Sequence, residues 1–156
     1  MGIDVYTAIN GKLAHHTGED PKDWTYDGVH GYLRESYGGG PFATAILLPE
    51  AFLTESNSEH CSEWLGQKVK KELPLRVISL LLYADEEAPY LAVECPAAIL
   101  RKRLAKTLST VVKRYKGFGI ELEKGNPVLQ QFIDFVELAE RVERETGQPI
   151  AVHISW

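Results

Sequence analysis

Apolar residues recur at intervals of three and four along two stretches of the chain, residues 96–116 and 127–146. This spacing places the apolar side chains on one face of an α-helix. A third stretch, residues 58–73, has the same spacing, and Ser56 and Glu59 lie at the distance of a capping box. The pattern therefore predicts two long helices and one shorter helix. The stripes of the long helices contain Leu100, Leu104, Leu108, Val111, Val112, Tyr115, Val128, Phe132, Phe135, Ala139 and Val142.

The residues at the ends of the two long stretches support this prediction. Asn126 suits an N-cap, because the residue before Pro127 is restricted to the extended backbone that an N-cap requires. Pro96 suits the first helical position, where no N–H is needed. Gly117 and Gly147 suit the C′ positions, which often have left-handed backbone.

Five segments have the β-branched and aromatic character of strands, namely residues 3–9, 43–48, 76–83, 90–95 and 149–155. Residues 76–83 also fit a buried helix, and we favour a strand because a connection and a second strand follow. Residues 11–29 are polar and predict either a long loop or a hairpin that begins and ends in turns, and residues 30–37 are too few to assign. We expect one α+β domain over residues 1–156. Its mixed sheet of four or five strands carries the two long helices on one face.

The composition narrows the class of protein. The chain has 156 residues, 44% of them hydrophobic and 25% charged, which is typical of one globular domain. Its formal charge of −5 argues against general nucleic-acid binding. The longest apolar run, residues 77–84, is far shorter than the ~20 residues of a membrane span, and no signal peptide is recognisable. Two cysteines are too few for a disulfide framework, which favours a reducing cytoplasm. Together with the absence of a long apolar run, this leads us to expect a soluble cytoplasmic protein without a membrane partner.

The chain contains the segments GIDVY, GYLRESYGGGPFAT with LLPEAF, VECPAAILRKRL and FVELAERVERETGQP. In these segments, roughly half of its length, it resembles a family of uncharacterised bacterial and phage-type proteins. The resemblance implies one compact domain and no particular activity. The prediction of a helix over residues 58–73 is based on the hydrophobic pattern alone.

Residues 30–41, HGYLRESYGGGP, hold the candidate ligand-binding residues, which are Tyr32, Arg34, Tyr37, Gly38, Gly39 and Gly40. The three glycines allow backbone N–H groups to converge on an anion. Arg34 could add a two-donor fork for phosphate or carboxylate, and the two tyrosines a flat surface for a base. The same segment also fits a tight corner between two buried elements. It contains neither GxxxxGK[ST] nor GxGxxG.

His30 lies four residues before Arg34 and close to Glu35. Together these side chains could perform general acid–base chemistry on a phosphoester, with His30 and Glu35 as the catalytic residues. The sequence does not show whether the three converge. None of the five histidines has the spacing of a metal site, so we expect no metal and no cofactor.

Positive charge is concentrated in one of the predicted helices. Residues 95–120 contain no acidic residue and seven basic ones, namely Arg101, Lys102, Arg103, Lys106, Lys113, Arg114 and Lys116. We favour internal pairing with the acidic residues of the following helix, over an anionic ligand or protein partner docked on the basic residues. If so, reversing the charge of Arg103 or Lys106 should change stability only slightly, since exposed ion pairs contribute ~0–1 kcal/mol.

These observations favour a binding protein over an enzyme. The expected ligand is a small anionic or nucleotide-like molecule held near residues 30–41. Sequestration of a host nucleotide signal is a reasonable use in a phage-type setting. The alternatives are a phosphoester hydrolase that uses His30 and Glu35, and a protein–protein inhibitor or interaction module. The partners that we consider are the small anionic ligand or nucleotide, a protein partner, and a second copy of the chain in a homo-oligomer.

Overall fold

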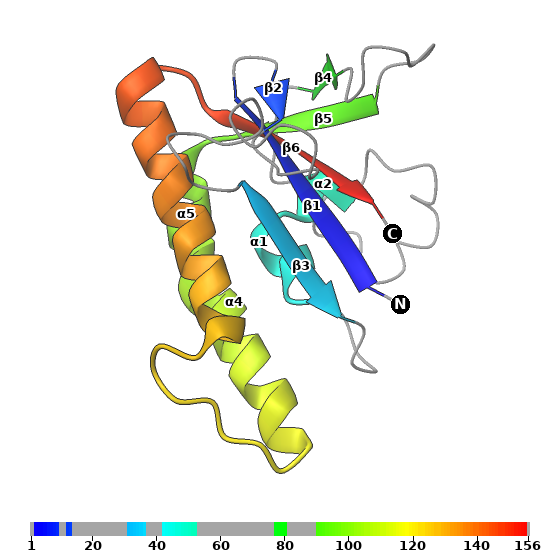
Figure 1. The fold of residues 1–156 in the computed structure, drawn as a ribbon, viewed down its shortest axis with the longest axis vertical. Helices are drawn as coiled ribbons and strands as arrows, with labels where there is room; N and C mark the ends of the chain where they lie inside the picture. The colour runs from blue at the N-terminus through cyan, green and yellow to red at the C-terminus, as the bar shows by residue number, and fades with distance from the viewer. Residues whose placement is uncertain are drawn as a thin grey trace, which may run out of the picture.

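Strand β1 (Gly2–Ile9) is the centre of the sheet in the computed structural model of the chain (Figure 1). One edge of β1 pairs with β6 (Ile150–Ser155). The other edge pairs with β3 (Tyr32–Ser36) and with the two-residue strand β2 (Lys12–Leu13). The structure describes residues 2–9, 12–13, 31–36, 42–52, 77–80 and 90–155.

The sheet continues beyond β6 through β5 (Tyr90–Cys95) and then β4 (Val77–Leu80). The α+β class is confirmed, and so is the strand within residues 76–83. The described part of the sheet differs from the prediction in two details. It contains six strands, where four or five were expected, and all five of their pairings are antiparallel, so this part is not mixed.

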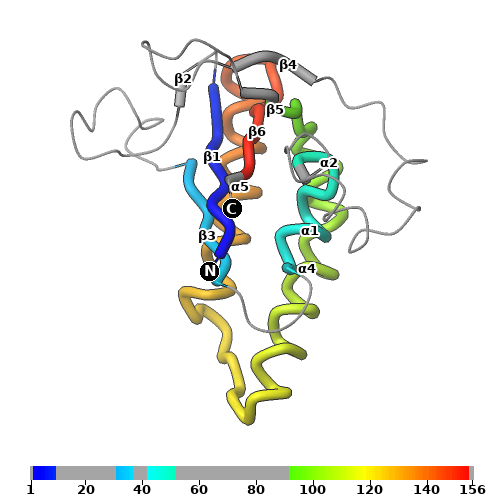
Figure 2. The backbone as a smooth tube through the Cα atoms, turned by 90° about the vertical axis from the view of Figure 1, so that its right-hand side faces the viewer, coloured from blue at the N-terminus to red at the C-terminus, as the bar shows by residue number. Residues whose placement is uncertain are grey.

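The helices lie on one face of the sheet. Helix α5 (Pro127–Thr146) packs against β3 and β6, and α2 (Pro49–Phe52) packs against β5 and β6. Helix α4 (Ala97–Gly117) packs against α5 and against α1 (Thr44–Leu47). Figure 2 shows α1, α2 and α4 on the same side of β1, β3 and β6. Alternate strand residues face these helices and form the core, including Ile3, Val5, Leu33, Val93, Val152 and Ile154.

The two long helices agree with their sequence pattern. The side chain of Asn126 accepts the Val128 N–H at 2.9 Å, and Gly147 has a φ of 73°, so the predicted start and end of α5 are both confirmed. The ends of α4 differ by one or two residues. Pro96 is its N-cap rather than its first residue, and the left-handed glycine is Gly119, with a φ of 77°, rather than Gly117.

The predicted strand over residues 43–48 is wrong, because these residues form the short helix α1. Phe42, Ala43, Thr44, Leu47 and Leu48 are all buried. A short helix of which almost every side chain is buried gives the same continuous apolar run as a buried strand, so the pattern could not separate them. The predicted helix over residues 58–73 and most of the predicted loop over residues 11–29 lie outside the described residues.

Thr7 offers a test of the core beneath β1. It is fully buried, and its hydroxyl has no hydrogen-bond partner among the described residues. Thr7→Val should raise the free energy of unfolding by about 1 kcal/mol, because an unpaired buried hydroxyl is unfavourable by about 1–3 kcal/mol. Thr44→Val is the matched control, since the equally buried Thr44 hydroxyl donates to Glu35 at 2.7 Å. Urea titrations should show opposite signs for the two variants, and equal signs would contradict this account.

A candidate binding cavity beside strand β3

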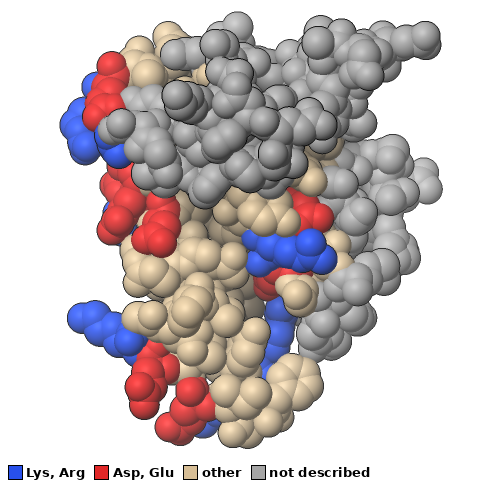
Figure 3. Space-filling model, viewed as in Figure 1, with Lys and Arg blue, Asp and Glu red and all other residues tan. Residues whose placement is uncertain are grey.

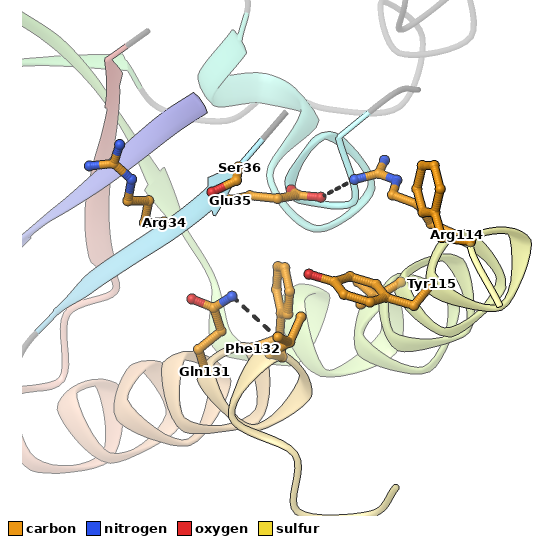
Figure 4. Close-up of a pocket in the computed structure, with 10 residues that line it drawn as sticks. Arg34, Glu35, Ser36, Arg114, Tyr115, Gln131 and Phe132 are labelled. Carbon is orange, nitrogen blue, oxygen red and sulfur yellow. Dashed lines mark hydrogen bonds and ion pairs between the residues drawn. The ribbon is translucent and has the colours of Figure 1, made fainter. Parts of the chain in front are cut away.

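A cavity of about 310 Å³ lies between β3 and the hairpin formed by α4 and α5 (Figure 4). The wall opposite β3 is mostly aromatic and aliphatic. It consists of Val111, Arg114, Tyr115, Phe118, Val128, Gln131 and Phe132. Phe118 is 65% exposed and Ile120, in the connection between the helices, is 49% exposed. In the space-filling view, uncharged side chains form a continuous area on this part of the molecule, with charged groups at its margins (Figure 3).

Glu35, at the edge of the cavity, is fully engaged in structural contacts. Its Oε1 accepts the Ala43 N–H at 2.7 Å and a guanidinium N–H of Arg114 at 2.8 Å. Its Oε2 accepts the Thr44 N–H at 2.8 Å and the Thr44 hydroxyl at 2.7 Å. A carboxylate at this place satisfies the free N–H groups at the start of α1. Glu35 therefore joins β3 to α1 and α4.

A second buried ion pair joins α4 to α2. Arg103 donates to both carboxylate oxygens of Glu50, at 2.9 and 2.6 Å, and to the carbonyl oxygen of Leu47 at 3.2 Å. Its side chain is only 17% exposed and that of Glu50 only 6%. Arg103 and Arg114 are eleven positions apart, three turns at about 3.6 residues per turn, so both project from the same face of α4.

The predicted pairing between the basic stretch and the acidic helix is therefore only partly right. Arg101 does pair with Glu140 of α5, which lowers the pKa of that carboxyl. Glu143 of α5 accepts the Ala97 N–H at 2.8 Å and so satisfies the start of α4. Arg103 and Arg114, however, pair with Glu50 and Glu35, which the charge pattern did not indicate.

Arg34 lies on the opposite face of the sheet from Glu35, because side chains alternate along β3. Its guanidinium is 3.5 Å from the Asp4 carboxylate and its side chain is 60% exposed. Figure 4 shows it directed away from the cavity. The Tyr32 hydroxyl donates to the same Asp4, and burial, followed by this hydrogen bond, raises the pKa of Tyr32.

The candidate residues chosen from the sequence are thus divided. Tyr32 and Arg34 share one face, Glu35 faces the other, and Arg34 and Glu35 do not converge. His30, Tyr37, Gly38, Gly39 and Gly40 lie outside the described residues. The four donors on Glu35 give this carboxylate a structural role, which argues against its use as a general base.

Three residues on the Arg34 face did not stand out in the sequence. The pairing register places Tyr32 opposite Tyr6 and Tyr6 opposite His153, and Asp4 lies opposite Arg34. The rings of Tyr6 and Tyr32 are 5.9 Å apart, and His153 is buried. The alternation of side chains between the two faces of the first and last strands was the signal in the sequence that could have grouped these residues. It identifies a shared face only when the two strands are known to be neighbours.

Other chemistry is sparse in the part of the chain that the structure describes. Cys95 is buried and its Sγ lies 3.5 Å from the Val93 carbonyl oxygen. Burial strongly raises the pKa of this thiol, so it stays protonated and is a poor nucleophile. Within the described ranges no three His, Cys, Asp or Glu side chains are grouped as metal ligands. No helix in those ranges is long and apolar enough to cross a bilayer.

The chain has no match among protein-family models, curated proteins or solved structures. No relative therefore assigns a role to any of its residues. The cavity between β3 and the α4–α5 hairpin, together with the contacts that surround it, is the basis for a functional conclusion.

Proposed function

We propose that the chain is a binding protein and that its ligand places an apolar or aromatic group in the cavity beside β3. The observation that carries this proposal is the predominantly apolar and aromatic helical wall of that cavity. Three charged residues line it. Glu35 and Arg114 are paired with each other at 2.8 Å, and Arg34 directs its guanidinium away from the cavity (Figure 4). A ligand with an uncharged flat or branched group fits such a wall better than a bare anion does.

The size of the cavity limits the ligand further. Small-molecule sites span about 300–1,000 Å³, and the observed 310 Å³ is at the lower end of that range. One ring system or one large side chain fits this space. The Arg34 guanidinium, expected from the sequence to hold an anion, faces away from the cavity.

Gln131 can supply specificity within this apolar wall. Figure 4 shows its side chain extending from α5 toward the cavity. Its Nε2 lies 3.4 Å from the Val128 carbonyl oxygen, which is long for a hydrogen bond. The amide can therefore turn to a ligand at little energetic cost, and it offers both a donor and an acceptor.

Ligand titrations followed by methyl NMR test the proposal. The probes are indole, the anion indole-3-acetate, and adenosine monophosphate. We expect indole to shift the methyl resonances of Val111 and Val128, which line the cavity. In Val128→Trp, where Val111 is the remaining reporter, indole should no longer shift the Val111 methyl resonances, because the Trp side chain fills the space. Ala105→Trp is the matched control because Ala105 is exposed on α4, so this variant should still bind indole.

The three probes separate the two ligand classes. Tighter binding of indole-3-acetate or adenosine monophosphate than of indole would favour the anionic ligand indicated by the sequence. Tighter binding of indole would favour an uncharged group. If none of the probes shifts either valine, or if Val128→Trp binds as well as the unchanged protein, the cavity is not a binding site.

A further inference from the structure

We infer that the natural ligand is an extended polypeptide segment that pairs with the outer edge of β3 and inserts one apolar side chain into the cavity. This inference rests on the proposed function and specifies its ligand. It depends on the direction of the backbone groups of β3. The Thr7 N–H donates to the Gly31 carbonyl oxygen at 3.0 Å, which makes these two residues a hydrogen-bonded pair between β1 and the start of β3.

Hydrogen-bonded and non-hydrogen-bonded pairs alternate along antiparallel strands. In the observed register, Leu33 opposite Val5 and Glu35 opposite Ile3 are therefore hydrogen-bonded to β1. The backbone N–H and C=O groups of Arg34 and Ser36 consequently point away from β1, toward the outer edge. Among the described residues, no strand pairs with that edge.

The same two residues line the cavity. Because the Arg34 side chain points to the opposite face, Arg34 contributes mainly main-chain atoms to the wall. The cavity thus has an apolar wall from α4 and α5 and, on its other side, backbone donors and acceptors at the repeat of a β-strand. A peptide that adds to a strand edge uses both features, because its backbone pairs with the edge while alternate side chains enter pockets.

The geometry also specifies the chemistry of the peptide. Residues directly opposite each other on paired strands project from the same face of the sheet. The peptide residue opposite Glu35 would therefore enter the cavity, whose 310 Å³ suits one large apolar side chain. Its neighbour, opposite Arg34, would lie beside a guanidinium that is 60% exposed. We expect an apolar residue next to an acidic one.

The test begins with a library of random linear peptides displayed on phage and selected on the immobilised full chain. A synthetic peptide with the selected consensus is then N-methylated at one backbone amide at a time. We expect affinity to fall roughly tenfold at every second position, the positions whose N–H groups face β3, and to change little at the positions between. This periodicity is specific to strand pairing and requires no change in the protein.

Variants of Arg34 test the same contact from the protein side. Arg34→Pro removes the outward N–H and leaves the hydrogen bonds to β1 in place, as proline is tolerated on edge strands. It should weaken peptide binding roughly tenfold, the effect of one lost hydrogen bond. Arg34→Ala removes the side chain beyond Cβ but keeps the backbone N–H, so it should keep the backbone pairing and lose only the preference for an acidic residue. A thermal melt checks the fold of both variants, and the N-methyl scan remains decisive if Arg34→Pro unfolds.

Three results would overturn the inference: no peptide selected, N-methylation effects without alternation, or full binding by a folded Arg34→Pro variant. If indole still shifts the Val128 methyl resonances in those cases, the cavity remains a binding site for another ligand. If indole binding also fails, the proposed function fails with it.

Discussion

Replacing Glu35 with alanine should lower the free energy of unfolding by about 3–5 kcal/mol, the effect of breaking a buried ion pair from one side. The change leaves Arg114, whose side chain is 13% exposed, without its carboxylate. It also removes the acceptor for the backbone N–H groups of Ala43 and Thr44 at the start of α1. Urea denaturation followed by circular dichroism measures the loss. A protein near the lower end of the ordinary stability range of about 5–15 kcal/mol would be left partly unfolded by this change.

The matched control is Arg34→Ala, on the same strand and on the opposite face. Its side chain is 60% exposed and its guanidinium lies 3.5 Å from the Asp4 carboxylate, so the free energy of unfolding should change by no more than about 0.5 kcal/mol. The double variant Glu35→Leu/Arg114→Leu should be less destabilised than the sum of its single changes, because neither charge is left alone. An effect of Glu35→Ala no larger than that of Arg34→Ala would show that Glu35 is not a structural contact.

Arg103→Glu should also lower the free energy of unfolding by about 3–5 kcal/mol, since it places a second carboxylate against buried Glu50. It also removes two hydrogen bonds to Glu50 and one to the Leu47 carbonyl oxygen. Sequence reasoning predicted a slight effect for this change, because it assigned the basic stretch to an exposed pairing with α5. The same urea titrations distinguish the two expectations.

Arg101→Glu is the control for charge reversal on the same helix. Arg101 pairs with Glu140, but its side chain is 47% exposed. Arg101→Glu should therefore lower the free energy of unfolding by only about 0–1 kcal/mol. The swap Arg103→Glu/Glu50→Arg should recover part of the stability lost in Arg103→Glu, since opposite charges again face each other. Equal losses for the Arg101 and Arg103 reversals would mean that the Arg103 pair is not buried.

The long helices could be predicted from sequence because local signals agree. The three-and-four spacing of Phe132, Phe135 and Ala139 defines a buried face, and Asn126 and Gly147 define the ends of α5. Residues 43–48 gave the wrong result for a physical reason. All of these side chains are buried except Ile46, which is apolar, so no polar face reveals the helical period. The carboxylate that accepts the N–H groups at the start of α1 comes from Glu35 on another element.

The candidate site was only partly predictable. Residues 30–41 did contain one wall of the cavity, since β3 lies within them. The other wall, with Val111, Val128 and Phe132, belongs to helical stripes that the sequence assigned to the core. A stripe that packs a core and one that lines a cavity have the same spacing, and only the position of the neighbouring strand separates them. Opposite roles for Arg34 and Glu35 follow from strand alternation, which could not be applied while residues 30–37 were unassigned.

The pairing of β1 with β6 has a consequence for how the chain folds. Asp4 lies opposite Ser155 and Ala8 opposite Ala151, so the middle of the sheet joins segments far apart in sequence. Contacts of this kind raise the contact order and slow folding, because a long loop must close before the pairing is gained. A ribosome also releases β1 long before β6 is made, and until then one edge of β1 is open to pairing with other nascent chains. We therefore expect this protein to complete its fold only after synthesis has passed β6, and to aggregate most readily while that edge is exposed.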